Sequence, residues 1–124
     1  NEEQTQNWIV KCIEKEDFEL GEINYIFCND NYLHKMNVEF LQHDTLTDII
    51  SFDYTIGKEI AGDIFISIER VKENALEFKV SFEEELKRVL IHGVLHYMNY
   101  KDKTEEEKQL MRSKENECLK QFSL

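Results

Sequence analysis

The sequence of 124 residues contains no proline and only four glycines, so no stretch of it is typical of a linker, a repeat or a low-complexity tract. It also lacks any apolar run near the roughly 18 residues that a membrane-spanning helix needs. The first residues, NEEQTQNW, are polar and acidic, unlike the apolar core of a secretory signal. We therefore expect residues 1–124 to form a single domain with one core and no membrane segment.

Cysteine is also scarce. Cys12, Cys28 and Cys118 are odd in number and widely spaced, and no C-x-x-C pair is present. This pattern favours neither a disulfide framework nor an all-thiolate zinc site. Free thiols are typical of a reducing compartment, so we predict a cytoplasmic protein in which each cysteine is a small buried apolar residue.

Basic side chains are outnumbered: 15 Lys and Arg face 26 Asp and Glu, which gives a net charge of −11. The imbalance is uneven along the chain. Residues 1–85 carry 7 basic and 20 acidic side chains, whereas residues 86–124 carry 8 basic and 6 acidic ones. The acidic part should repel bare nucleic acid and favour basic partners. We find no basic stripe strong enough to predict tight nonspecific binding of nucleic acid.

The hydrophobic patterns predict a small α+β domain. Helical spacing of apolar residues, together with S-x-x-E and T-x-x-E capping boxes at Ser81 and Thr104, indicates five helices. Alternating apolar residues indicate strands in EINYIFC, TDIISFDY and EIAGDIFISIE, and Gly62 inside the last suggests a bulge or a close backbone approach. We expect a mixed sheet of about four strands packed with about five helices, one of them a metal-binding helix like that of zinc hydrolases.

The segment HGVLHYMNYKD, residues 92–102, carries the strongest chemical signal. His92 and His96 are four residues apart, so on a helix their imidazoles lie one turn apart on one face and can reach one ion. Asn99 favours the left-handed conformation that ends helices, after which Asp102 can return toward the histidines. We predict that His92, His96 and Asp102 bind one divalent metal ion, with zinc preferred. The alternative is a helix end with two ordinary histidines and a loop carboxylate.

Gly93 narrows the chemistry of such a site. It stands where peptidases of the H-E-x-x-H type carry their general-base glutamate, so a peptidase would need another base. A glycine inside a helix costs about 1 kcal/mol relative to alanine, and we expect it to let another backbone or a bulky substrate approach the metal. Three ligands with an open position favour a catalytic ion over a structural one. The P-C-x-x-C of deaminases and the H-x-D…H order of non-haem iron oxygenases are both absent.

At these residues the chain resembles the YbeY family of bacterial metal-dependent endoribonucleases, whose motif is H-G-x-L-H-L-x-G-Y-D-H. The matching residues are His92, Gly93, Leu95, His96 and Tyr100. Two upstream blocks, TDIISF at 47–52 and AGDIFI at 61–66, resemble the T-[DN]-V-L-S-F and L-G-D-I-x-I blocks of that family, in the same order.

Three positions depart from the family pattern. Asn99 stands in place of a glycine, Asp102 in place of the third histidine of most members, and Leu41 in place of an arginine that many members carry before the T-[DN] block. A carboxylate ligand weakens a Lewis acid more than a neutral imidazole does. With Leu41 at this position, the chain lacks the arginine side chain that could contact a phosphate there.

The resemblance implies a zinc site in a cleft between helix and sheet, and a role in ribosomal RNA maturation and ribosome quality control. The partners it implies are ribosomal RNA and the small ribosomal subunit with its basic proteins. For the reaction we expect an activated water to attack a phosphodiester of single-stranded RNA. Asp48 is the candidate general base, the alternative being a carboxylate at a strand end. Thr47, Ser51 and His43 are candidates for orienting substrate.

Two other readings remain open at this point. A metal hydrolase of another substrate class, such as a peptidase, would share the ligand pattern. A ribosome-assembly factor without catalytic activity would use the metal to hold its fold, and its acidic residues would suit docking on basic ribosomal proteins.

Overall fold

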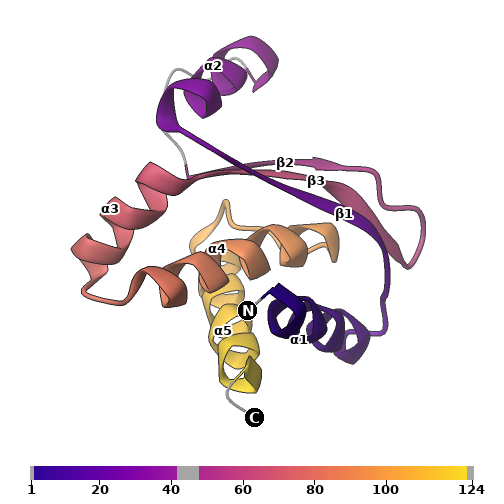
Figure 1. Ribbon diagram of the computed structural model, residues 1–124. Coiled ribbons are helices and arrows are strands. Elements are labelled where there is room, and N and C mark those ends of the chain that lie inside the picture. The colour runs from indigo at the N-terminus through magenta and orange to yellow at the C-terminus, as the bar shows by residue number, and fades with distance from the viewer. Residues whose placement is uncertain (1, 42–47, 123–124) are drawn as a thin grey trace.

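The computed structural model describes residues 2–41 and 48–122 (Figure 1). This part of the chain forms five helices and three strands. In chain order they are α1 (Glu2–Lys15), β1 (Glu19–Cys28), α2 (Asp30–Leu41), β2 (Ile49–Asp53), β3 (Glu59–Ser67), α3 (Ile68–Phe78), α4 (Phe82–Tyr97) and α5 (Glu105–Phe122). None of these helices has the length and apolar character needed to cross a membrane.

The sheet is mixed, with the strand order β1-β3-β2. The central strand β3 runs parallel to β1, with Tyr25 opposite Ile64, and antiparallel to β2, with Ser51 opposite Ile64. The α+β class, the mixed sheet and the five helices are confirmed, but the described residues form three strands rather than about four. The strand pairing shows no bulge at Gly62. Its register shift lies instead in β1, between Leu20 and Ile23.

The inner face of the sheet carries the main core. Figure 1 shows α1, α4 and α5 on this side and α2 on the other. The cluster has 17 buried hydrophobic residues, among them Ile64 of β3 and Leu95 of α4, both fully buried. On the outer face, the described residues that form a buried cluster under α2 are Leu33, Met36 and Ile50. β2 therefore packs against other elements on both of its faces, as expected for a strand with apolar residues on both sides.

The two capping boxes start the helices that build the site. The Ser81 hydroxyl accepts a hydrogen bond from the Glu84 amide at 3.1 Å and begins α4. At α5 the box is complete, since the Thr104 hydroxyl accepts from the Glu107 amide at 3.1 Å and the Glu107 carboxylate accepts from the Thr104 amide at 2.9 Å. Each cap satisfies amides at a helix start that have no partner within the helix.

Two long-range contacts hold α4 and α1 in place. Gly62 lets α4 approach the sheet, because a side chain there would lie 2.5 Å from the Tyr97 hydroxyl and 2.4 Å from the Phe52 carbonyl. The Tyr97 hydroxyl lies 3.0 Å from the Phe52 carbonyl and 3.1 Å from the Asp63 carbonyl, so the predicted close approach is confirmed. At α1 the indole of Trp8 donates to the Cys118 carbonyl at 2.6 Å.

Candidate metal centre

Three potential ligand atoms meet at the C-terminal end of α4. His92 Nε2 lies 3.1 Å from His96 Nε2, and Asp102 Oδ2 lies 3.2 Å from the first and 3.3 Å from the second. An ion with tetrahedral bonds of about 2.0–2.2 Å would separate its ligands by about 3.3–3.6 Å. The triangle is therefore close to one face of a zinc coordination tetrahedron, and these residues are the group in the described chain that could hold a metal ion.

The turn after α4 brings Asp102 back to the histidines. Asn99 has a positive φ of 73°, the left-handed conformation predicted for it. The Tyr100 amide donates to the Leu95 carbonyl at 3.1 Å, which closes the helix end. The Tyr100 hydroxyl then donates to the carboxylate of Glu16, in the turn that follows α1, so the returning segment is tied to a second part of the chain.

Glu115 of α5 supports the site from behind. This glutamate is only 5% exposed, and its Oε2 lies 2.6 Å from His92 Nδ1 while its Oε1 accepts from Arg88 at 2.9 Å. A hydrogen bond from Nδ1–H to the carboxylate leaves the Nε2 lone pair directed at the triangle, which is how metal-binding histidines are usually oriented. The arrangement thus fixes both the ring position and the tautomer that metal binding needs.

The charges of this pair favour ion pairing. Burial raises the pKa of Glu115, but the hydrogen bonds from His92 and Arg88 outweigh burial, and the pKa of Glu115 is lowered. Burial lowers the pKa of His92, but the hydrogen bond and charge of Glu115, with the charge of Asp102, outweigh it and raise that pKa. Without metal, a proton therefore competes for the same nitrogen that would bind the ion.

Gly93 has a different role from the predicted one. A side chain at this position would lie 3.0 Å from Ile49 Cδ1 and 3.0 Å from Ile64 Cδ1. Gly93 therefore allows the histidine helix to pack closely on side chains of β2 and β3. The expectation of a backbone or substrate beside the metal was wrong, because Gly93 points to the sheet.

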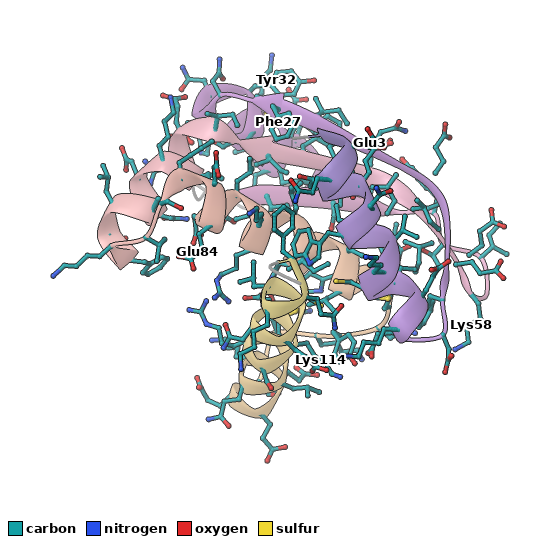
Figure 2. All side chains as sticks on the ribbon, turned by 60° about the horizontal axis from the view of Figure 1, so that its bottom comes forward. Glu3, Phe27, Tyr32, Lys58, Glu84 and Lys114 are labelled. Atoms are coloured by element: carbon teal, nitrogen blue, oxygen red, sulfur yellow. The ribbon has the colours of Figure 1, made fainter. Side chains whose placement is uncertain are left out.

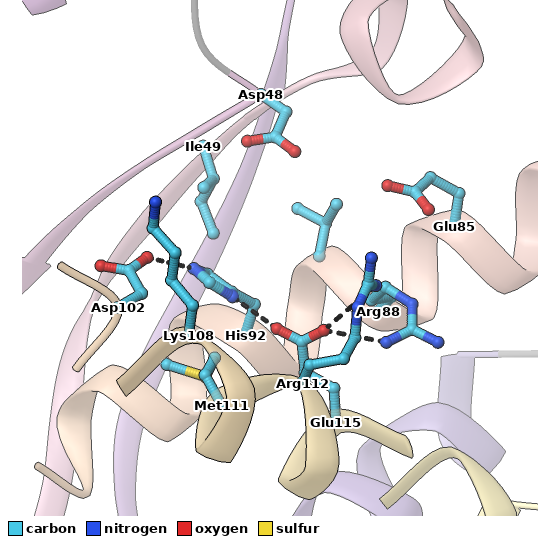
Figure 3. A pocket seen from close by; sticks show the side chains of 11 residues that line it. Asp48, Ile49, Glu85, Arg88, His92, Asp102, Lys108, Met111, Arg112 and Glu115 are labelled. Atoms are coloured by element: carbon cyan, nitrogen blue, oxygen red, sulfur yellow. Dashed lines mark hydrogen bonds and ion pairs between the residues drawn. The ribbon is translucent and has the colours of Figure 1, made fainter. Parts of the chain in front are cut away.

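A pocket of about 300 Å³ opens beside the triangle (Figure 3). We call it the site pocket; its lining residues are Asp48, Ile49, Glu85, Arg88, Val89, His92, Asp102, Lys108, Met111, Arg112 and Glu115. The side chains of His92, His96 and Asp102 are 24%, 31% and 39% exposed, so water and a substrate can reach the ligand atoms. The predicted cleft between helix and sheet is therefore present.

Asp48 lies in this pocket, at the start of β2 (Figure 3). Burial raises the pKa of Asp48 more than the nearby His92 lowers it. The side chain also accepts from Asn74 at 3.4 Å, and the Asp48 carbonyl accepts from the Ser67 amide at 3.0 Å. A carboxylate with these surroundings is suited to taking up a proton.

Of the remaining candidates for substrate contact, Ser51 is the one that the structure describes. Ser51 is not among the residues that line the site pocket. Thr47, His43 and the side chain of Leu41 lie outside the described residues.

The sequence analysis missed Glu115, Arg88 and Glu85. Met111, Glu115 and Cys118 are all buried and follow one another at intervals of four and three along α5. A glutamate in such an apolar stripe predicts a buried partner, and this signal was available in the sequence. On α4, Glu85, Val89 and His92 likewise follow one another at intervals of four and three. Burial raises the pKa of Glu85.

The family model described as Endoribonuclease YbeY matches residues 1–123. The chain is 63% identical over 122 residues to Endoribonuclease YbeY of Flavobacterium johnsoniae, covering 98% of this chain and 88% of that protein. It is 66% identical over 116 residues to Endoribonuclease YbeY of Flavobacterium psychrophilum, covering 94% and 83%. The corresponding protein of Christiangramia forsetii is 59% identical, covering 98% and 85%.

The fold is also similar to a solved structure. The solution structure of TM1509 from Thermotoga maritima aligns with a TM-score of 0.71 and 26% sequence identity, covering 97% of this chain and 79% of that one. The likeness extends over nearly the whole chain and agrees with the α+β architecture described above.

Proposed function

The chain belongs to the endoribonuclease YbeY family, and we propose that it is a metal-dependent endoribonuclease whose ion is held by His92, His96 and Asp102. The observation that carries the assignment of ligands is the near-equilateral triangle of their donor atoms, with sides of 3.1 to 3.3 Å. Two imidazole nitrogens and one carboxylate oxygen suit zinc, which we propose as the ion.

Side chains of the protein have separate roles around that ion. When bound, the ion supplies Lewis-acid chemistry, making a water more acidic and offsetting charge on a phosphoryl group. Glu115 holds the His92 ring in place through the 2.6 Å contact. Asp48, at the start of β2 in the same pocket, accepts the proton of the attacking water. Its raised pKa makes it a stronger base than an exposed aspartate.

The metal content of purified protein tests the ligand assignment. We expect near one zinc per chain by elemental analysis, lost in both His96→Ala and Asp102→Ala, with RNA cleavage lost in parallel. His34→Ala is the matched control, because His34 lies on α2 across the sheet from the site. Zinc retained by Asp102→Ala would exclude that carboxylate from the ligands.

The role of Asp48 needs a separate variant. Asp48→Asn keeps the size of the side chain and the backbone bond to Ser67 but removes the base. We expect normal zinc content with a strong loss of kcat on RNA. Cleavage at the unmodified rate would mean that Asp48 has only a structural role before β2. Casein as a second substrate tests for the peptidase reaction that the missing glutamate disfavours.

We propose that the RNA is ribosomal and that the protein acts in the cytoplasm with the small ribosomal subunit. The resemblance of residues 47–52, 61–66 and 92–102 to the family motifs supports this substrate, and the free thiols of Cys12, Cys28 and Cys118 support the location. The excess of acidic residues before position 86 suits contact with basic ribosomal proteins.

Sedimentation with ribosomal subunits tests the partner. We expect the unmodified protein to sediment with small subunits and to cleave their RNA. Sedimentation by His96→Ala protein that lacks both zinc and cleavage would show that docking is independent of the ion. An unmodified protein that docks but cleaves no RNA would instead favour the assembly-factor alternative.

A further inference from the structure

Two further hollows adjoin the site pocket, and Arg112 lines all three. The first, which we call the α5 groove, has a volume of about 610 Å³ and is lined by Lys108, Gln109, Arg112, Ser113, Asn116, Glu117 and Lys120. The second, the Phe78 hollow, has about 250 Å³ and is lined by Phe78, Val80, Glu84, Glu85, Arg88 and Arg112. The three hollows therefore meet around Arg112, and the site pocket among them is also lined by His92 and Asp102.

The α5 groove is basic although the protein as a whole is acidic. Lys108, Arg112 and Lys120 lie on one side of α5, at intervals of four and eight residues. This stripe is about 18 Å long at 1.5 Å per residue, enough for several phosphates of an extended strand. Glu117 also lines the groove, but its carboxylate is paired with Lys15 at 3.3 Å and Lys114 at 3.5 Å. Figure 2 shows α5, with Lys114 labelled, projecting from the body of the domain.

Arg112 is placed to bind a phosphate next to the metal centre. Its side chain is 56% exposed, and its ion pair with Glu115 spans 3.8 Å, beyond hydrogen-bond range. Glu115 is already bonded to Arg88 and His92. The guanidinium of Arg112 therefore keeps donors for a phosphate, which such a group binds in bidentate fashion.

The Phe78 hollow offers a surface for a base. Phe78 ends α3 and is 53% exposed, and the following Lys79 adopts a left-handed conformation that fixes the helix end. Exposed aromatic rings beside cationic grooves bind unpaired bases by stacking, whereas the bases of a duplex are already stacked on each other. The combination of ring, guanidinium and basic stripe suits single-stranded RNA.

We propose that one RNA strand stacks a base on Phe78, passes the metal centre with a phosphate on Arg112, and continues along the α5 groove over Lys108 and Lys120. This assignment rests on the endoribonuclease function proposed above, because it places the phosphate held by Arg112 beside the one that is cleaved. Arg112 is then a substrate-binding residue, and Phe78 and Lys120 set the path of the strand on either side.

Fluorescence anisotropy with a fluorescein-labelled, fully 2′-O-methylated RNA of 12 nucleotides tests the path. We expect Arg112→Gln to weaken binding about tenfold and to reduce the slope of log K against log salt by about 0.7, the value for one phosphate contact on a single strand. Lys120→Gln should weaken binding less than Arg112→Gln does. In the RNA cleavage assay it should raise KM without lowering kcat. Lys11→Gln is the control, because Lys11 is exposed on α1 and lines none of the three hollows.

Phe78→Ala distinguishes a single strand from a duplex. We expect it to weaken binding of the single strand about tenfold, as loss of one stacked base predicts, and to leave binding of the matched duplex unchanged. Binding by Arg112→Gln and Lys120→Gln equal to that of Lys11→Gln would overturn the path. Equal loss on both RNA forms in Phe78→Ala would overturn the stacking of a base on that ring.

The two proposals fail in different ways. Cleavage and zinc content are measured on the same preparations, and Arg112→Gln should keep its zinc. If the unmodified protein cleaves RNA but the groove variants bind normally, the path is wrong and the endoribonuclease stands. If binding depends on Arg112 but no preparation cleaves RNA, the reaction is wrong and the binding path stands.

Discussion

The main core on the inner face of the sheet contains 17 buried hydrophobic residues, most of them from the sheet, α1, α4 and α5, whereas the outer face has three under α2, counted over the described chain. The candidate metal centre belongs entirely to the inner side. His92 and His96 lie on α4, which Gly93 and Tyr97 hold close to β2 and β3. Side chains packed at crystal density transmit small displacements. The position of the ligands should therefore depend on the inner core and be insensitive to the outer one.

The largest effect is expected for Ile64→Ala on the inner face. Ile64 is fully buried and lies against Gly93 in the histidine helix. The cavity should lower the free energy of unfolding by about 4 kcal/mol, within the range for such truncations. Urea unfolding of the metal-free protein measures this, and a zinc competition titration should show weaker binding.

Leu33→Ala is the matched control on the outer face. Leu33 is 1% exposed, but its cluster is small and its partly buried neighbours can relax into the space. We expect a loss of about 2 kcal/mol with unchanged zinc affinity. Comparable losses of zinc affinity in the two variants would remove the distinction between the faces.

Gly62→Ala should cost about 3 kcal/mol, at the upper end for overpacking. The added methyl would meet the Phe52 carbonyl and the Tyr97 ring at once, and the carbonyl belongs to the backbone of the sheet. The β2 backbone and α4 must therefore both shift, and zinc affinity should fall with stability. Full stability by urea unfolding would show that α4 can shift freely, against the argument from close packing.

Glu115→Gln should act on the metal centre with less effect on the fold. We expect zinc affinity to fall about 10–100-fold, the usual range for losing a carboxylate behind a ligating histidine. Competition titration with a chelator measures it. Glu117→Gln, on the exposed side of the same helix, should leave the affinity unchanged, and equal affinities in the two variants would contradict the supporting role.

The smallest effect is expected for Tyr97→Phe, which removes the hydroxyl near the Phe52 and Asp63 carbonyls and keeps the ring. The unfolding free energy should fall by about 1 kcal/mol, as for one hydrogen bond. A much larger loss by urea unfolding would mean that the hydroxyl, and not the space left by Gly62, holds the helix to the sheet.

The features that the sequence predicted correctly are formed by residues close together in the chain. The spacing of His92 and His96, the left-handed Asn99 and the Thr104 cap lie within 13 residues, and together they return Asp102 to the helix. The α+β class followed from hydrophobic patterns, which record whether each element has one buried face or two.

The features that the sequence did not predict depend on contacts between two different helices or strands. Glu115 reaches His92 from another helix, 23 residues away, and only the packing of α5 on α4 brings them together. Gly93 was assigned to the metal because its neighbour in sequence is a ligand, but its neighbours in space are Ile49 and Ile64. The three hollows that meet at Arg112 likewise join α3, α4 and α5.

The bond between Trp8 and the Cys118 carbonyl has a consequence for synthesis of the protein. The partners are 110 residues apart, and at about 5–20 residues per second roughly 5 to 20 seconds separate their emergence. During that interval the apolar side of α1, with Trp8, Ile9 and Ile13, has no α5 to pack against. This part of the core can therefore form only after α5 has been made, and until then the growing chain carries a helix whose apolar side lacks its partner.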